Sequence, residues 1–251
     1  MLEYRTFCYM QNQKTGCTFV ESFLREFSAE PLVHYEKHAI AKKRDAAKFY
    51  FINVREPLAL YRSLFAYGLD GKGTVFLRLQ RLGHEALYAD GPAGFSQWLR
   101  FVLDSGNAAA LGNGYGPQVA EIAGLMSWRF LRLSTFGFEG AAAKLGSRKE
   151  LNQYFKAHYF MNAVIKQEKL RDDLSTMVEK KLGPNLKDVP AALAWINATP
   201  KINVSESLTG SDEVPVDPQV QARLFSKERL LYRHFYPDAA GFAEWRATKD
   251  S

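Results

Sequence analysis

The run Lys48–Val54, "KFYFINV", restricts the fold of this chain more than any other segment. A continuous apolar and aromatic run of this length is typical of a strand that is buried on both faces, as in a parallel sheet. The run ends at "REP", residues 55–57. Open α/β sheets bind ligands just beyond the carboxyl ends of such strands, so we expect a binding site here.

A second β-prone segment, residues 4–10, leads through "QNQKTGCT" into a helical pattern, "TFVESFLREF". The helix is indicated by apolar residues on one face, namely Phe19, Val20, Phe23, Leu24 and Phe27. Thr18 followed by Glu21 is typical of a capping box, which predicts a helix that begins right after the lysine loop. A helix N-terminus offers backbone N–H groups and a positive dipole end to an anion.

The order of residues in this loop differs from that of the common nucleotide loop, G-x-x-x-x-G-K-[ST], because Gly16 follows Lys14. The N–H groups of residues 15–18 can surround one tetrahedral anion, while the Lys14 ammonium lies against an oxygen that bridges to the next group. Without upstream glycines there is little room for a triphosphate. The loop therefore favours a 5′-phosphate that carries one further group.

The segment "VREPLALYRS" adds an arginine, Arg55, and a hydroxyl eight residues later, Ser63. Together they can bind a second phosphate, the arginine through a bidentate fork and the serine through a single hydrogen bond. Arg55 taken alone could equally be a salt-bridge partner, so both interpretations stay open.

Alternating strand and helix patterns predict an α/β protein with a parallel sheet and helices on its faces. The segments 32–39 and 158–166 are expected to contain strands, and 105–117 to form a mobile loop. Long helices are expected over 58–69, 118–133, 168–183 and 219–236.

The amino-acid composition limits the possible functions less than these sequence segments do. The 251 residues suit one large domain, and the net charge of +6 permits an anionic partner without requiring one. We find no nucleic-acid motif, no apolar run that could span a membrane and no secretion signal. Cys8 and Cys17 lie near no Cys/His set, so we expect no metal and a reducing, cytoplasmic location.

The two phosphate segments together resemble the sulfotransferases that use 3′-phosphoadenosine 5′-phosphosulfate (PAPS), in particular the carbohydrate sulfotransferases of Golgi and bacterial type. "QKTGCT" is similar to their 5′-phosphosulfate loop, P-K-T-G-[GT]-T. "INVREPLALYRSLFAYG" is similar to their 3′-phosphate segment, V-R-[DN]-P-x-x-R-x-x-S-x-Y, and "KHAIA" to a K-H-x-x-A stretch before it. Weaker similarities are "VIKQEKLRDDL" and "INVSES".

The chain also departs from this pattern. Gln13 replaces the loop proline, Glu56 replaces the Asp or Asn before the second proline, and Leu60 stands where the family has a further arginine. Residues 70–160 match nothing in the family, so the resemblance leaves the acceptor undefined.

The resemblance implies a single sulfotransferase-like domain over 1–251, with a three-layer P-loop-like fold and a largely helical insertion at about 70–160. It implies PAPS as cofactor, adenosine 3′,5′-bisphosphate as product, no metal requirement, and an acceptor hydroxyl on a small molecule or glycan. The cofactor-binding residues would be Lys14, Thr15, Gly16, Cys17, Thr18, Arg55 and Ser63.

The resemblance also implies catalytic roles. Lys14 would stabilise charge on the leaving oxygen. A histidine can accept the proton of the acceptor hydroxyl, and His38 in "KHAIA" is the first choice, His34 the second and Glu36 the reserve. The helix N-terminus would lower the pKa of the Cys17 thiol, although packing against the loop is the simpler role for this side chain.

Two other functions are compatible with parts of the pattern. A P-loop kinase or nucleotide hydrolase would need an acidic residue for Mg²⁺ at the strand end, where this chain has Arg55. A basic module that binds an acidic polymer is the non-enzymatic alternative.

Overall fold

The computed structural model describes residues 1–112, 114–200 and 214–250. The chain forms two compact units. The first unit comprises Met1–Arg55, Arg132–Phe136 and His158–Val204, and the second comprises Glu56–Leu131, Gly137–Ala157 and Ser205–Ser251.

The first unit contains the strands and a small set of helices. In chain order they are β1 (Leu2–Glu3), β2 (Phe7–Met10), α1 (Cys17–Phe27), β3 (His34–Tyr35), β4 (Phe49–Val54), β5 (Ala163–Lys166), the 3-10 helix η4 (Gln167–Lys169), α10 (Leu170–Met177), the π-helix η5 (Val178–Leu182), the 3-10 helix η6 (Gly183–Asn185) and α11 (Val189–Ala198). The strands expected within 32–39, 48–54 and 158–166 are therefore confirmed.

The five strands form one mixed sheet in the order β3-β1-β2-β4-β5. β2, β4 and β5 are parallel neighbours, but β1 is antiparallel to both β2 and β3. The expectation of a parallel sheet is therefore wrong for β1 and its two neighbours. A connection as short as that between β1 and β2, closed by a bond from Tyr4 N to Phe7 O of 2.9 Å, can join only antiparallel strands.

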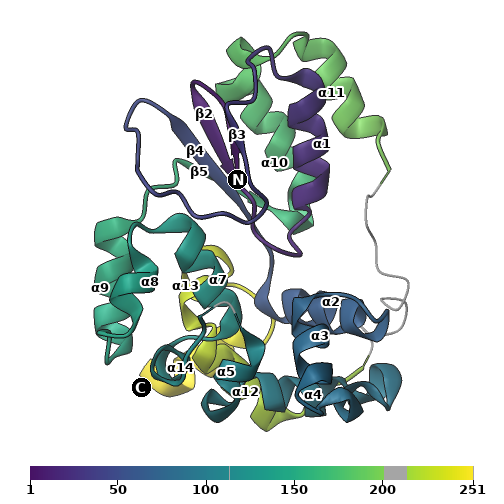
Figure 1. Cartoon of the computed structure of the whole chain (residues 1–251), viewed down its shortest axis with the longest axis vertical. Helices are drawn as coiled ribbons and strands as arrows, with labels where there is room; N and C mark the ends of the chain where they lie inside the picture. The colour runs from purple at the N-terminus through teal and green to yellow at the C-terminus, as the bar shows by residue number, and fades with distance from the viewer. Residues whose placement is uncertain (113, 201–213, 251) are drawn as a thin grey trace. The chain divides into compact units, whose positions relative to one another are not determined.

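One face of this sheet is covered by α1, α10 and α11, which lie together beside it (Figure 1). Because side chains alternate along a strand, Phe7 and Tyr9 of β2 and Phe51 of β4 point to this face and are fully buried there. The helical layer of the first unit thus accounts for the packing of Phe49 and Phe51, whereas Tyr50, Ile52 and Val54 alternate to the opposite face and are at most 3% exposed. A third layer, as in a P-loop-like fold, stays a prediction.

The second unit is helical. It contains α2 (Pro57–Leu69), α3 (Thr74–Arg81), η1 (Glu85–Tyr88), η2 (Gly91–Gly94), α4 (Phe95–Val102), η3 (Ser105–Asn107), α5 (Ala108–Leu111), α6 (Pro117–Ile122), most of α7 (Leu125–Ser134), α8 (Phe138–Ala142), nearly all of α9 (Arg148–His158), α12 (Pro218–Lys227), α13 (Arg229–Phe235) and α14 (Phe242–Asp250). The region expected to be a mobile loop, 105–117, instead contains η3 and α5.

Two of the long helices expected from sequence are each broken into two by one buried carboxylate. Glu228, between α12 and α13, is 0% exposed. Its Oε1 accepts hydrogen bonds from Tyr61 Oη at 2.6 Å and Met126 N at 3.1 Å, and its Oε2 accepts from Ser127 N at 2.8 Å and Ser127 Oγ at 2.7 Å. The carboxylate therefore caps the N-terminus of α7.

Gly124 makes this arrangement possible from the other side. A Cβ atom at Gly124 would lie 2.0 Å from Glu228 Oε1, so a side chain there would displace the carboxylate. Its N–H donates to Lys227 O at 2.8 Å, which fixes the turn between α6 and α7.

Within the part of the chain that the structure describes, no helix has the length and apolar character needed to cross a bilayer. The "INVSES" similarity, with Ser205, lies outside the described residues.

Candidate functional site

The candidate site is the lysine loop, Gln11–Gly16, which joins the end of β2 to the start of α1. β2 and β4 are parallel and pair directly, with Met10 opposite Ile52. Because the carboxyl ends of parallel strands meet at one edge, the loop lies beside the last residues of β4. The structure thus brings the two sequence segments together.

The backbone of the loop is curled by two residues with positive φ, Lys14 at 61° and Gly16 at 79°. The left-handed conformation costs a residue with a Cβ atom about 1–2 kcal/mol, so other interactions must hold Lys14 there. Such strain is concentrated at functional sites. At Gly16 a Cβ atom would also come within 3.1 Å of Leu170 Cδ2, so the glycine serves both the turn and the packing.

α1 begins at Cys17, as expected, but the predicted capping box is wrong. The N-cap residue is Gly16, no side chain caps the helix, and its first turn has no acidic residue. Glu21 instead accepts hydrogen bonds from Gln11 Nε2 at 2.8 Å and Arg25 Nε at 2.9 Å. The start of α1 therefore presents its positive dipole end without an acidic side chain, which suits an anion.

A buried polar network supports the loop from below. Asn12 Nδ2 donates to Asn53 O at 3.3 Å, and Asn53 Nδ2 donates to Thr15 O at 3.0 Å. Thr15 Oγ1 donates back to Asn12 O at 2.9 Å. All three side chains are at most 4% exposed. These bonds fix the loop carbonyls and hold the strained backbone in place.

Sequence reasoning missed the two asparagines. A signal was present, since Asn53 interrupts an otherwise apolar run one residue before it ends, and Asn12 follows β2 within two residues. A buried amide in such a run must find hydrogen-bond partners, and the nearest polar backbone is that of the loop.

His38 reaches the lysine loop. Its Nδ1 atom lies 2.9 Å from Gln11 O, and its own φ of 60° turns the chain toward the loop. A carbonyl oxygen can only accept, so Nδ1 carries the proton and Nε2 is the basic nitrogen of the neutral ring. In this tautomer Nε2 is the atom that can accept a proton.

His34 and Glu36, the other two candidate bases, are not held by the loop. His34 lies on the edge strand β3, which is separated from β2 by β1, a distance of roughly 10 Å at normal strand spacing. Its Nε2 lies 4.0 Å from the Glu36 carboxylate, and the two side chains are 47% and 70% exposed. They form a solvated pair at the sheet edge.

Arg55 is tied to the loop, because its Nη1 donates to Lys14 O at 3.4 Å. Ser63 lies on α2 of the second unit and is 3% exposed, and its role in binding stays a prediction. Glu56, the departure from the family pattern, caps α2 by accepting from Ala59 N at 2.6 Å, and it also accepts from Tyr232 Oη.

The Cys17 thiol is buried at 7% exposure, and this burial raises its pKa. The nearby Lys37 ammonium opposes the rise without reversing it. The expected lowering by the helix N-terminus is therefore wrong, and Cys17 is a packing residue at the start of α1.

The groups at the loop are Lys14 and Arg55 as cations, the start of α1 as a dipole, and the Glu21 carboxylate, which accepts a hydrogen bond from the loop residue Gln11. This set of donors fits a phosphate or sulfate group, and His38 adds a base beside it. Among residues 1–112, 114–200 and 214–250, no group of three or more His, Cys, Asp and Glu side chains could hold a metal ion.

No protein-family model, no curated protein and no solved structure matches this chain.

Proposed function

We propose that this chain is a sulfotransferase that transfers a sulfuryl group from PAPS to an acceptor hydroxyl. The proposal rests mainly on one arrangement, in which a loop with a lysine at its turn and a helix N-terminus behind it also holds a histidine through its Nδ1 atom, so that Nε2 is the basic nitrogen of the neutral ring. A loop that only binds phosphate has no need of a base. The resemblance of the loop and the "VREP" segment to PAPS-dependent enzymes supplies the identity of the donor.

The residues present fit the two anionic parts of PAPS. Lys14, Thr15, Gly16, Cys17 and Thr18 would hold the 5′-phosphosulfate through the loop backbone and the lysine ammonium. Arg55 would serve the 3′-phosphate, and its bond to Lys14 O would then couple the two phosphate sites. Ser63 would add a hydroxyl.

When bound, PAPS supplies the sulfuryl group: the acceptor oxygen forms a bond to sulfur, the bond from sulfur to the bridging phosphate oxygen breaks, and adenosine 3′,5′-bisphosphate leaves. His38 Nε2 takes the proton of the acceptor hydroxyl while Nδ1 keeps its bond to Gln11 O. Lys14 neutralises negative charge that develops on the leaving oxygen. The strained, well-supported loop holds both groups in position.

The acceptor is a hydroxyl compound, and a carbohydrate is favoured by resemblance. A three-layer P-loop-like fold and a cytoplasmic location belong to the same proposal.

Calorimetric titration with adenosine 3′,5′-bisphosphate and with adenosine 5′-monophosphate tests the proposal. The wild type should prefer the bisphosphate by at least tenfold, and Arg55→Ala should reduce this preference to within about threefold, since a charge-assisted hydrogen bond contributes about 1.5–3 kcal/mol. Arg5→Ala, which removes an exposed arginine of the same unit, is the control and should keep the preference. An absence of binding at millimolar bisphosphate would refute the proposal.

A kinase or nucleotide hydrolase gives the opposite results. Tighter binding of ATP with Mg²⁺ than of the bisphosphate, or activity that EDTA abolishes, would favour that class.

A further inference from the structure

Gln11, the first residue of the lysine loop, is bonded to His38 and to α1 through two different atoms. Its backbone oxygen lies 2.9 Å from His38 Nδ1, and its side-chain Nε2 donates to Glu21 Oε2 at 2.8 Å. The residue is 0% exposed. Because the carbonyl and the side chain belong to one buried residue, the bond to Glu21 also restrains the group that binds the histidine.

The orientation of the Gln11 amide follows from its partner. A carboxylate oxygen can only accept, so Nε2 faces Glu21 and Oε1 points away from it. Among the described residues, Oε1 is buried and has no hydrogen-bond partner. A buried acceptor without a protein partner is unfavourable, and an apolar side chain of similar length would fill the same space. Packing alone therefore gives no reason for glutamine at this position.

Glu21 is held by two further donors. Its carboxylate accepts from Arg25 Nε at 2.9 Å and from the hydroxyl of Tyr35 on β3. The Arg25 guanidinium lies 4.4 Å from the centre of the Tyr35 ring, so these two donors are also in contact with each other. Burial alone would raise the pKa of Glu21, but the hydrogen bonds from Arg25, Gln11 and Tyr35 lower it, so the carboxylate is charged at neutral pH.

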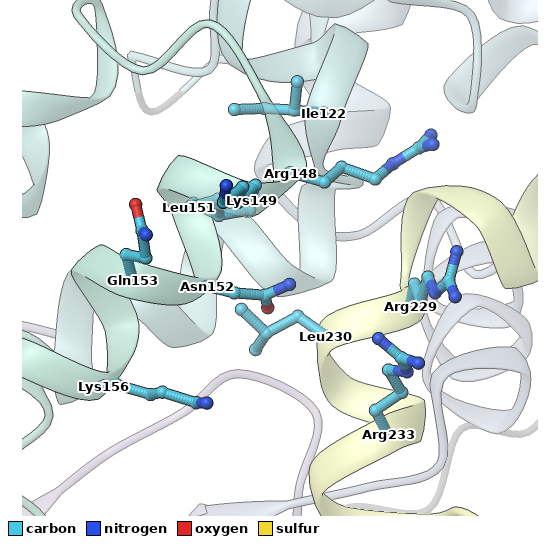
Figure 2. A pocket seen from close by; sticks show the side chains of 10 residues that line it. All are labelled: Ile122, Arg148, Lys149, Leu151, Asn152, Gln153, Lys156, Arg229, Leu230 and Arg233. Carbon is cyan, nitrogen blue, oxygen red and sulfur yellow. The ribbon is translucent and has the colours of Figure 1, made fainter.

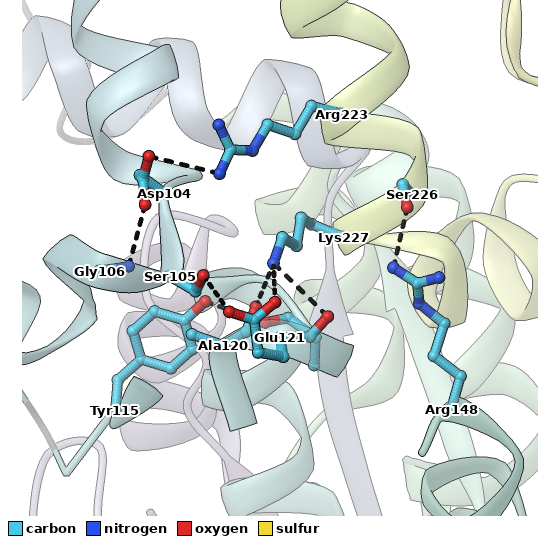
Figure 3. Close-up of polar contacts among 11 residues, drawn as sticks. Asp104, Ser105, Gly106, Tyr115, Ala120, Glu121, Arg148, Arg223, Ser226 and Lys227 are labelled. Atoms are coloured by element: carbon cyan, nitrogen blue, oxygen red, sulfur yellow. Dashed lines mark hydrogen bonds and ion pairs between the residues drawn. The ribbon is translucent and has the colours of Figure 1, made fainter. Parts of the chain in front are cut away.

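Polar side chains of the second unit show different arrangements. Lys227 Nζ of α12 lies 3.8 Å from Glu121 Oε2 of α6, and this ion pair joins two helices (Figure 3). Asn152 and Gln153 of α9 line a cavity between α9 and α13 and are half-buried and exposed, respectively (Figure 2). Gln11 differs from both groups, because it is fully buried and also carries the carbonyl that binds a candidate base.

We propose that Gln11 and Glu21 are positioning residues for His38. The charged Glu21 carboxylate orients Gln11, and the Gln11 carbonyl keeps the proton of the neutral ring on Nδ1, so that Nε2 is the basic nitrogen. The catalytic consequence rests on the sulfotransferase proposal, whereas the control of the His38 tautomer does not.

Nitrogen-15 chemical shifts of the His38 ring measure this control directly. At about pH 8, where an ordinary imidazole is neutral, the wild type should carry the proton on Nδ1. Gln11→Met keeps the backbone carbonyl and a side chain of similar length but loses the amide. This variant should shift the ring toward the tautomer protonated at Nε2, which histidine prefers in water. The spectrum of His38→Ala assigns the signal.

Variants of Glu21 test the same link from its other partner, whose side chain is 13% exposed. Glu21→Leu should shift the tautomer in the same direction as Gln11→Met, and Glu21→Gln, which keeps an acceptor, should shift it less. The double variant Gln11→Met/Glu21→Leu should shift it no further than the stronger single variant, because both remove one interaction. Glu26→Leu, on the exposed side of α1, is the control and should leave the ring shifts unchanged.

Sulfuryl-transfer kinetics give the second readout. Gln11→Met should lower kcat by about tenfold to a hundredfold, since a displaced base loses its alignment with the acceptor hydroxyl. The affinity for adenosine 3′,5′-bisphosphate should change less than about threefold, because the anion-binding groups are untouched. Heat unfolding of each variant reports whether it is folded.

Unchanged ring shifts in folded Gln11→Met and Glu21→Leu would overturn the inference. An equal change in Glu26→Leu would overturn it too, since any disturbance of α1 would then have the same effect. So would losses of kcat that multiply in the double variant, because they would show two independent roles. A wild type that transfers no sulfuryl group would instead refute the proposed function, and the ring shifts alone would then decide the inference.

Discussion

The lysine loop depends on a residue in a conformation that its side chain disfavours. Lys14 has a φ of 61°, and its carbonyl accepts from Arg55 while the adjoining Thr15 carbonyl accepts from Asn53. A residue is kept in such a state only when its neighbours determine its position. The proposed function needs both this backbone and an ammonium group, which is a reason for lysine rather than glycine at position 14.

Replacing Lys14 should therefore separate stability from activity. Lys14→Gly should be more stable than Lys14→Ala by roughly 0.5–1 kcal/mol, because the left-handed penalty on alanine exceeds the entropy that glycine loses on folding. Both variants should lose about a hundredfold or more in turnover. Urea unfolding and a sulfuryl-transfer assay measure the two effects. Equal stability of the variants, or turnover near that of the wild type, would contradict this account.

In the proposed function His38 is the general base, because the hydrogen bond at Nδ1 makes Nε2 the basic nitrogen of its neutral ring. His38→Ala should lower kcat by about 10²–10⁴ while the affinity for adenosine 3′,5′-bisphosphate changes less than about threefold. His34→Ala is the matched control and should stay within twofold of the wild-type kcat. An equal loss of kcat in the two variants would contradict the assignment of His38 as the base.

At the scale of elements, the break between α6 and α7 and the break between α12 and α13 follow from one contact, that of Gly124 with Glu228. α6 and α7 are separated at Gly124, α12 and α13 at Glu228, and the two breaks touch one another. The Glu228 carboxylate accepts hydrogen bonds from Met126 N and Ser127 N in the first turn of α7. In a continuous helix these two N–H groups would instead donate to carbonyls one turn earlier. Both segments have the periodicity of one long helix, so only the contact between them explains their interruption.

A methyl group at Gly124 should disturb this contact. Gly124→Ala should lower the free energy of unfolding by about 1–3 kcal/mol, because its Cβ atom would lie 2.0 Å from Glu228 Oε1. Gly140→Ala, on α8, is the control, since no atom lies within 4 Å of its Cβ position and alanine favours a helix by up to about 1 kcal/mol. Denaturant unfolding compares the two. If both substitutions have the same sign, the close approach at Gly124 is wrong.

Burial raises the pKa of Glu228, partly offset by the bonds from Tyr61 and Ser127. The folded state then holds this proton more tightly than the unfolded state does. Its contribution to stability is complete below the unfolded pKa of 4.5 and declines as the pH rises through the folded pKa. The stability of the wild type relative to Glu228→Gln should accordingly be greater near about pH 5 than near about pH 8. A constant difference in urea unfolding would contradict the shift.

At the scale of the whole molecule, neither compact unit is a continuous piece of chain. The backbone passes from one unit to the other after residues 55, 131, 136, 157 and 204. The lysine loop comes from the start of the sequence, yet the core beneath it is completed by Ile165 and Leu174 and by the helices around them. The candidate site thus requires distant parts of the chain.

A shortened chain should show this dependence. The fragment 1–161 keeps the lysine loop and Arg55 but lacks β5, α10 and α11, so it should be largely unfolded and should not bind adenosine 3′,5′-bisphosphate. Amide proton dispersion and calorimetry measure both properties, and co-expression with residues 162–251 should restore them. Wild-type affinity in the isolated fragment would contradict the assigned core.

The sequence by itself predicted the elements whose signals are local. The apolar run of β4, the start of α1 after the lysine, and the loop with Lys14 and Gly16 follow from periodicity and from the residues needed at a turn. Arg55 could be named as a candidate phosphate ligand because it directly follows a buried strand.

Only the tertiary structure decided the features that depend on partners remote in sequence. It joined His38 to the loop by the bond to Gln11 O, placed Asn53 beneath the loop, and paired β1 antiparallel to β2 so that the sheet is mixed. Burial also raises the pKa of the Cys17 thiol, which is opposite to the effect expected from its place at a helix N-terminus. The spacing of apolar residues along the chain reveals the periodicity of a helix or strand. The hydrogen-bond partners of a side chain and its burial are set by the fold.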